Sequence, residues 1–177
     1  METTLNLRPG QVAIVTGVDH TIQHYIDNLA ANDPRNLLRL RFQDFLGQIT
    51  GGYPVDVICE EAKHGRVSIA ETLASREHIQ YVNIEMSPER RAELGIPPMY
   101  TVDPESEIAP EQKAHWNDQR EAHMVYELLR AISGARAVIV ICGVLHMPPM
   151  IDALRSKFTR VEQYDVTALT WFDKTLL

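Results

Sequence analysis

The chain of 177 residues has little of several features that usually reveal function. It holds only two cysteines, Cys59 and Cys142, which are too few for a disulfide framework and are typical of a reducing compartment. Its longest apolar run, residues 137–142, is far shorter than the roughly 20 residues of a membrane-spanning helix. Residues 1–4 lack the basic and apolar regions of a signal peptide. We therefore predict a cytoplasmic protein with no membrane partner.

Basic clusters and familiar catalytic motifs are also missing. The chain has 17 Lys and Arg against 24 Asp and Glu, a formal net charge of −7, and no long run of Lys or Arg, so nucleic acid is a poor default partner. The sequence contains no G-x-x-x-x-G-K-[ST], no G-x-G-x-x-G, no G-x-S-x-G and no C-x-x-C. Composition thus indicates an acidic globular protein and leaves its chemistry open.

The pattern of apolar residues predicts the fold class. Residues 135–143 form a continuous apolar run rich in β-branched residues and closed by glycine, which is typical of a strand buried on both faces of a parallel sheet. Similar but weaker runs occupy residues 11–16, 55–59, 79–84 and 161–166. We predict an α/β fold, an open, mostly parallel sheet of about five strands with helices on both faces.

Helix-start signals lie between these predicted strands. Asp33-Pro34, Ser68, Pro110 and Pro148-Pro149 each precede a segment with apolar residues at helical spacing. Ser87-Pro88 predicts a short turn of helix that Gly95 can stop. We expect Gly47 to end the regular part of the helix that starts at Pro34. Four prolines mark residues 96–110 as a long surface loop. Two separate halves would be too small for good cores, so residues 1–177 are predicted to form a single α/β domain.

Polar side chains follow three of the predicted strands. Gly17–His20 comes after the first strand and Gly143–His146 after the fourth, so two G-x-x-H motifs stand in the same relation to their strands. The second strand is followed by Glu60, Glu61 and then His64. Ligands of open α/β sheets bind beyond the carboxyl ends of the strands. We therefore expect a functional site at this edge of the sheet.

Two kinds of chemistry fit these residues. His20, His146 and a glutamate could hold a divalent metal such as Zn, Mn or Co, with an open position for water. The same set could act without a metal, with a histidine as general base and a carboxylate that orients it. Strand alternation sends Glu60 and Glu61 to opposite faces, and we choose Glu61 as the metal ligand together with the two histidines.

Arg120 lies on the apolar stripe of the helix that starts at Pro110. An arginine on the core side needs an anionic partner, which is either Glu60 or Glu61, or an anionic group of a substrate. The expected catalytic residues are His20, Glu60, Glu61, Arg120 and His146. The expected substrate contacts are Gly17, His64, Arg120 and Gly143. We expect the remaining histidines that have no spacing argument, His24, His78 and His115, to lie on the surface.

The order of these motifs resembles a superfamily that groups Tiki-type proteases, TraB/PrgY pheromone-shutdown proteins, erythromycin esterases and ChaN haem-binding lipoproteins. Members show a G-x-x-H after the first strand, a later Glu, an Arg on a helix and a second G-x-x-H. The matching residues span 11–157 and look most like the TraB end of the group; they are Gly17, His20, Glu60 or Glu61, Arg120, Gly143 and His146. Residues 61–65 also resemble the E-x-x-H-G of the esterases, where that motif normally follows the first strand.

The resemblance implies a hydrolase acting on a small molecule or peptide, but not one mechanism. Tiki-type members look metal-dependent, erythromycin esterases look metal-independent, and ChaN-like members bind haem. A metal, if used, would be held by His20, Glu61 and His146, and Arg120 would bind the developing anion.

Two other classes of function stay open. One is a non-catalytic module that binds an anion or haem, or regulates, on the same fold. The other is an interaction protein in which the 96–110 loop, with Met99 and Tyr100, contacts a partner. The weakly patterned fifth strand is a candidate exposed edge, which leaves a homo-oligomer open.

Overall fold

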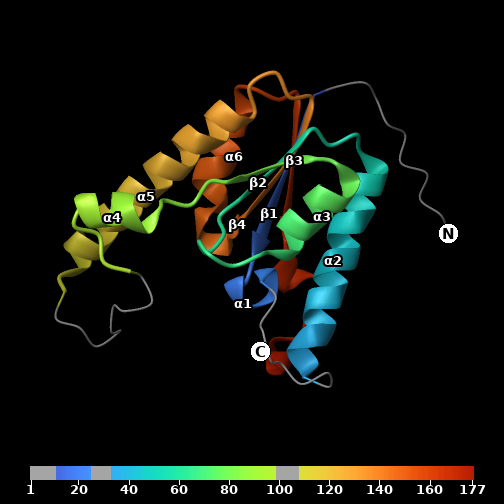
Figure 1. The fold of residues 1–177 in the computed structure, drawn as a ribbon, viewed down its shortest axis with the longest axis horizontal. Helices are drawn as coiled ribbons and strands as arrows, with labels where there is room; N and C mark the ends of the chain where they lie inside the picture. The colour runs from blue at the N-terminus through green and yellow to red at the C-terminus, as the bar shows by residue number, and fades with distance from the viewer. Residues whose placement is uncertain (1–10, 25–32, 99–107) are drawn as a thin grey trace.

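The computed structural model describes residues 11–24, 33–98 and 108–177. Its centre is a five-stranded sheet in the order β3-β2-β4-β1-β5, in which all neighbouring strands are parallel (Figure 1). The strands are β1 (Val12–Val18), β2 (Val57–Glu60), β3 (Gln80–Asn83), β4 (Ala137–Gly143) and β5 (Arg160–Asp165). The predicted open α/β sheet is confirmed, and the weak fifth strand forms one of its edges.

The two central strands, β1 and β4, are buried along their whole length. Alternation along each strand divides their side chains between two cores. Ile14 and Ile139 belong to the core on one face, and Val15 and Val140 belong to the core on the other. Because both faces need apolar side chains, these strands read in the sequence as unbroken apolar runs.

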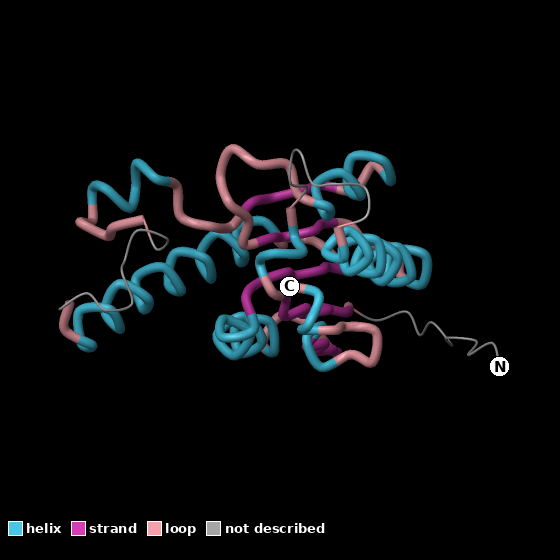
Figure 2. The backbone as a smooth tube through the Cα atoms, turned by 90° about the horizontal axis from the view of Figure 1, so that it is seen from below, coloured by secondary structure: helices cyan, strands magenta, loops and turns pink. Residues whose placement is uncertain are grey.

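Helices cover both faces of the sheet (Figure 2). One face packs against α2 (Pro34–Gly52) and α3 (Ile69–Glu77), and the other against α5 (Pro110–Ala131) and α6 (Met147–Arg155). Two short helices complete the pattern, α1 (His20–Gln23) and α4 (Pro88–Glu93).

Most predicted helix starts are confirmed by side-chain caps. Asp33, Ser68 and Ser87 each accept a hydrogen bond from a backbone N–H in the first turn of the helix that follows. The predicted stop at Gly47 is wrong, because α2 continues to Gly52. Burial of apolar side chains on either side of Gly47 outweighs the modest cost of a glycine within a helix.

The order of the strands places a topological switch at the centre of the sheet. The chain leaves β1 through α1 toward α2 on one face, and leaves the adjacent β4 through the short turn η2 (Val144–His146) toward α6 on the other. Open α/β sheets bind ligands at such a point. Both G-x-x-H motifs lie here, at the carboxyl ends of β1 and β4.

The predicted loop 96–110 is described only in part. Ile96 is buried and α5 begins at Pro110, whereas Met99 and Tyr100 lie outside the described residues.

Among the helices of the described segments, none combines the length and the apolar character that crossing a membrane requires.

Candidate functional site

Three of the predicted site residues meet at the carboxyl edge of the central strands. His20 follows β1, Glu61 follows β2 and His146 follows β4. The Oε1 atom of Glu61 lies 3.7 Å from Nε2 of His20 and 3.6 Å from Nε2 of His146. The two imidazoles therefore flank one carboxylate oxygen, although the three residues are far apart in the sequence.

The Glu61 carboxylate is buried and held from two sides. Its Oε1 atom accepts from Nη2 of Arg120 at 3.1 Å, and its Oε2 atom accepts from the backbone N–H of Gly143 at 2.8 Å. The Glu61 backbone N–H also donates to the carbonyl of Ile141 in β4. These contacts fix the carboxylate at the point where both imidazoles can reach it.

Arg120 has a second carboxylate partner, which sequence reasoning missed. Its Nη2 atom donates to Oε2 of Glu85 at 2.5 Å, and Glu85 also pairs with Arg91 at 2.7 Å. Burial alone would raise the pKa of Glu85, but the hydrogen bonds from Arg120 and Arg91 and their charges outweigh it and hold the pKa below its usual range. Arg120 is thus buried between two anionic side chains, and it positions Glu61.

His146 is oriented by a carboxylate on α5. Its Nδ1 atom lies 2.8 Å from Oε1 of Glu121, which also accepts from Nδ2 of Asn117. A carboxylate can only accept, so Nδ1 carries the proton in this contact, and the tautomer compatible with it leaves Nε2 as the proton acceptor. This is the arrangement by which a carboxylate prepares a histidine to act as a base.

His20 is oriented by an amide instead. Its Nδ1 atom hydrogen-bonds Oε1 of the buried Gln23, whose Nε2 atom donates to Oε1 of Glu60 and to the carbonyl of Glu61, both at 3.1 Å. Arg39 holds the same short helix by donating to the carbonyls of Thr21 and of the helix C-cap His24. Gln23 therefore links His20 to both glutamates.

Glu60 lies on the opposite face of the sheet from the two imidazoles. Its Oε2 atom accepts from the hydroxyls of Ser68 and Tyr81. Burial raises the pKa of Glu60 to about 7, and these hydrogen bonds and the one from Gln23 offset part of that shift. The predicted catalytic residue Glu60 thus reaches the site only through Gln23.

The glycines of the two G-x-x-H motifs have different roles. A side chain at Gly17 would place its Cβ 2.2 Å from Sδ of Met147, so Gly17 allows α6 to pack on β1. A side chain at Gly143 would place its Cβ 3.0 Å from Nε2 of His20. Only Gly143 makes room for a predicted site residue.

The site opens into a cleft of about 1250 Å³. His20, Glu61, Arg120 and His146 line it together with the predicted substrate contact His64, whose Nε2 atom hydrogen-bonds the carbonyl of Glu85. Neither Gly17, Glu60 nor Gly143 is among the residues that line it. The walls also carry apolar side chains, namely Ala62, Met86, Ile96, Pro97 and Leu145.

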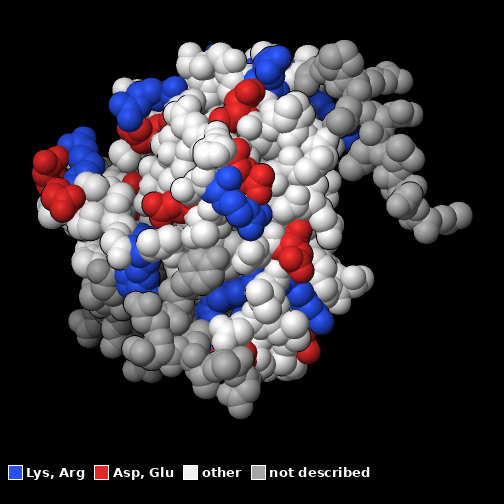
Figure 3. All heavy atoms as spheres, turned by 45° about the vertical axis from the view of Figure 1, so that its right-hand side comes forward, with Lys and Arg blue, Asp and Glu red and all other residues white. Residues whose placement is uncertain are grey.

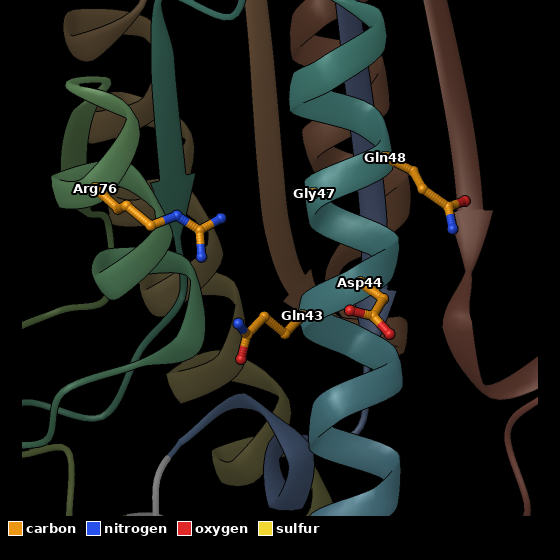
Figure 4. Close-up of a pocket in the computed structure, with 5 residues that line it drawn as sticks. All are labelled: Gln43, Asp44, Gly47, Gln48 and Arg76. Atoms are coloured by element: carbon orange, nitrogen blue, oxygen red, sulfur yellow. The ribbon is translucent and has the colours of Figure 1, made fainter.

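A second, smaller hollow of about 410 Å³ lies between α2 and α3 (Figure 4). Gln43 and Arg76 point toward each other across it, while Gln48 points away. Its lining holds no histidine, and the outer face seen in Figure 3 intermixes Lys and Arg with Asp and Glu. The chemistry-bearing residues of the described segments gather instead at the sheet edge.

The side chains around Glu61 are of types that bind metal ions, but they are not arranged as a metal site. Two imidazole nitrogens and a carboxylate oxygen are ordinary ligands of Zn²⁺. Within residues 11–24, 33–98 and 108–177, however, no group of three or more His, Cys, Asp or Glu side chains is placed to hold a metal ion. The guanidinium of Arg120 already lies against Glu61 and would repel a second cation. The residues as they are arranged do not fit a metal ion. Metal analysis of the purified protein tests the predicted metal site.

Several residues that shape the site were missed by sequence reasoning. Glu85 follows β3 as Glu61 follows β2, so the rule that found Glu61 could have found it. Glu121 and Gln23 gave no comparable signal, because they matter through contacts between elements. The expectation that His24 lies on the surface is wrong, since it is buried beside the cleft and its Nε2 atom accepts from the Lys63 backbone N–H. His78 and His115 are exposed as expected.

No family model, no curated protein and no solved structure matches this chain. The resemblance to the Tiki, TraB and erythromycin esterase group therefore stays a prediction from short motifs.

Proposed function

We propose that this chain is a hydrolase in which His146 activates a water molecule in the cleft. The observation that carries the proposal is the 2.8 Å contact between Nδ1 of His146 and Oε1 of Glu121. It leaves Nε2 as a proton acceptor in a residue that lines the cleft. A positioned general base of this kind contributes about 10²- to 10⁴-fold in rate.

Glu61 supports the charge that develops during such a reaction. When Nε2 of His146 takes a proton from water, an imidazolium forms 3.6 Å from Oε1 of Glu61. The fixed carboxylate stabilises that cation by its charge, while Glu121 holds Nδ1 as the acid of a catalytic triad does. Arg120 and the Gly143 backbone N–H keep Glu61 in place, so we assign Arg120 a positioning role instead of the expected direct contact with the developing anion.

His20 is the group that can protonate the leaving group. Its side chain is 55% exposed and lines the cleft, and its Nε2 atom lies 3.7 Å from the same Glu61 oxygen. In the proposed reaction the water oxygen bonds to a carbonyl or phosphoryl centre of the substrate and the bond to the leaving group breaks. The proton taken from water resides on His146. His20, which donates its Nδ1–H to Gln23, acts as an imidazolium and passes its Nε2 proton to the leaving group. Solvent then takes the proton from His146 and returns one to His20.

A second candidate is a cleft that binds an anion without turnover. Among the described residues that line it, Lys and Arg outnumber Asp and Glu, although the whole chain carries a net charge of −7. This observation favours anion recognition and is compatible with either function. The two candidates separate by whether any substrate is turned over.

The experiment is a hydrolysis screen of esters, amides, lactones and phosphate esters with the wild type and with His146→Asn. We expect at least about a 100-fold loss in kcat in His146→Asn, whereas His78→Asn should keep wild-type activity. His78 is an exposed helix cap in the left-handed region, which Asn adopts readily.

Two results would contradict the proposal. One is the absence of turnover on the whole panel by a folded wild type. The other is stoichiometric Zn, Mn or Co in the purified protein with activity lost on chelation and restored by that metal, which would favour the metal-dependent mechanism instead.

A further inference from the structure

We infer that the cleft takes a substrate with a carboxylate or phosphate group attached to an apolar body, and that the turn Lys63–Arg66 binds the anionic group. This inference rests on the proposed function, because it names the substrate class of the same site. Its main support comes from the turn Lys63–Arg66 and from Leu145, which the proposed hydrolytic step does not use.

The first observation is the charge of the cleft. Among the described residues, six basic side chains line it: Arg35, Lys63, Arg66, Arg91, Lys113 and Arg120. Of the lining residues that the structure describes, two are acidic, Glu61 and Glu85, and Arg120 engages both. Arg91 also pairs with Glu85, and Arg35 pairs with Asp33. In an acidic protein, this concentration of positive charge attracts an anion into the cleft.

The second observation is the position of the turn. The Arg66 backbone N–H donates to the Lys63 carbonyl at 3.3 Å, and Gly65 adopts a φ of +78°, a left-handed conformation that favours glycine. The Nε2 atom of His64 then reaches the Glu85 carbonyl at 3.0 Å. This fixed turn holds the exposed side chains of Lys63 and Arg66 on the wall of the cleft.

The turn contacts His24, which directly follows the short helix α1 that carries His20. The Lys63 backbone N–H donates to Nε2 of His24, one turn of chain beyond His20. The pKa of His24 is lowered by burial and then by the positive charges of His20, Arg66 and Lys63. Lys63 and Arg66 therefore place positive charge at the end of the cleft where His20 and His24 lie. We expect the anionic group of a substrate bound at His20 to contact them.

The third observation is the apolar part of the cleft lining. Leu145 is 86% exposed although it directly precedes His146, and it lines the cleft with Met86, Ile96 and Pro97. A large apolar side chain held in water beside a polar site favours burial against an apolar part of a ligand. The geometry thus points to an amphipathic anion rather than a bare ion.

Calorimetric titration of the His146→Asn protein tests this inference without turnover. The probes are phenylbutyrate, phenyl phosphate and the neutral amide of phenylbutyrate. We expect the anions to bind at least about tenfold more tightly than the amide, because a charge-assisted hydrogen bond is worth about that factor or more. The anion with the lower Kd identifies the group as carboxylate or phosphate.

Arg66→Gln in the same background should weaken the preferred anion about tenfold and leave the amide unchanged, whereas Arg66→Lys should retain most of the affinity. The matched control is Arg155→Gln, because Arg155 is paired with Asp152 on α6 and is absent from the cleft lining. Affinity for the anion should also fall as salt rises.

Equal binding of anion and amide, or equal effects of Arg66→Gln and Arg155→Gln, would overturn the inference. Hydrolysis of neutral esters by the wild type as fast as of anionic ones would overturn it and leave the proposed function intact. Arg66-dependent anion binding without hydrolysis of any substrate would support the anion site and overturn the proposed hydrolase.

Discussion

Glu60 and Glu61 are adjacent in the chain and both are buried, yet the sheet gives them opposite surroundings. Glu60 points toward the face covered by α2 and α3, where two hydroxyls and an amide donate to it. Glu61 points toward the opposite face, where the Arg120 guanidinium and two imidazoles meet it.

Successive residues at the end of a strand face opposite sides of the sheet, so two adjacent glutamates can have different functions. Burial raises the pKa of Glu60 to about 7, so that face holds a carboxyl that gains or loses its charge near neutral pH. On the other face Arg120 contacts Glu61 and Glu85, and the hydrogen bonds and charges of Arg120 and Arg91 hold the pKa of Glu85 below its usual range. Only that second face supplies the fixed charge that acid–base catalysis requires.

The largest effect on stability should come from breaking the charged face. Arg120→Met leaves Glu61 and Glu85 buried without their shared guanidinium, so the free energy of unfolding should fall by about 3–5 kcal/mol. Arg130→Met is the control, because the exposed side chain of Arg130 pairs with Glu127 at the surface of α5, and its loss should change stability by less than about 1 kcal/mol. Denaturant titration measures both, and equal changes would contradict the assigned role of Arg120.

The second effect concerns the pH dependence from Glu60. Its folded-state pKa of about 7 is above the ordinary value of 4.5, so the folded state binds more protons than the unfolded state between those values. Its stabilising contribution is therefore complete below about pH 4.5 and is lost as pH rises through about 7, by about 3 kcal/mol.

Glu60→Gln should flatten that fall in the free energy of unfolding, whereas Glu77→Gln on the exposed side of α3 should keep it. Glu85 acts with the opposite sign, since its lowered pKa gives stability that is lost only as pH falls through that value. Denaturant titration from pH 4 to pH 8.5 checks the sign. A wild type whose stability rises across this range through Glu60 would contradict the account.

The third effect distinguishes the roles of Gly17 and Gly143, the glycines of the two G-x-x-H motifs. Gly17→Ala forces Cβ against Sδ of Met147 and near the Val144 backbone, and should cost about 1–3 kcal/mol of stability. Gly143→Ala meets the imidazole of the half-exposed His20, which can move away, so we expect a smaller loss of stability and a lower kcat. Thermal unfolding and initial rates measure the two outcomes, and the reverse pattern would refute the assignment.

The smallest effect should come from Gln23, the side chain that links His20 to Glu60. Gln23→Leu removes the acceptor of His20 Nδ1 and the donor to Glu60, and should lower kcat about tenfold by releasing the orientation of His20. Gln23→Glu keeps an acceptor for Nδ1 and should recover part of the rate. A change in KM alone would indicate that Gln23 shapes binding and not the orientation of His20.

The sequence predicted the parts of this account that depend on local pattern. The unbroken apolar runs of β1 and β4 indicated a buried parallel sheet, and the carboxyl-edge rule brought His20, Glu61 and His146 together. Alternation along β2 predicted that Glu60 and Glu61 would separate.

What it could not predict are the partners that tertiary packing chooses. Glu121 reaches His146 because α5 crosses the edge at which β4 ends, and Glu85 reaches Arg120 because β3 lies beside β2. These contacts depend on strand order, which no local pattern encodes. The burial of His24 could not be predicted for the same reason, because His24 forms an antiparallel β-bridge with the distant residue Ser68.

The most direct test of the central claim is kcat/KM for Glu61→Gln and Glu60→Gln, measured together on a substrate found in the hydrolysis screen. Both changes replace a buried carboxyl by its amide at neighbouring positions, so they differ chiefly in the face they alter. The account predicts a loss of at least about 100-fold for Glu61→Gln and no more than a few-fold change for Glu60→Gln. Similar losses in both variants, or the larger loss in Glu60→Gln, would contradict it.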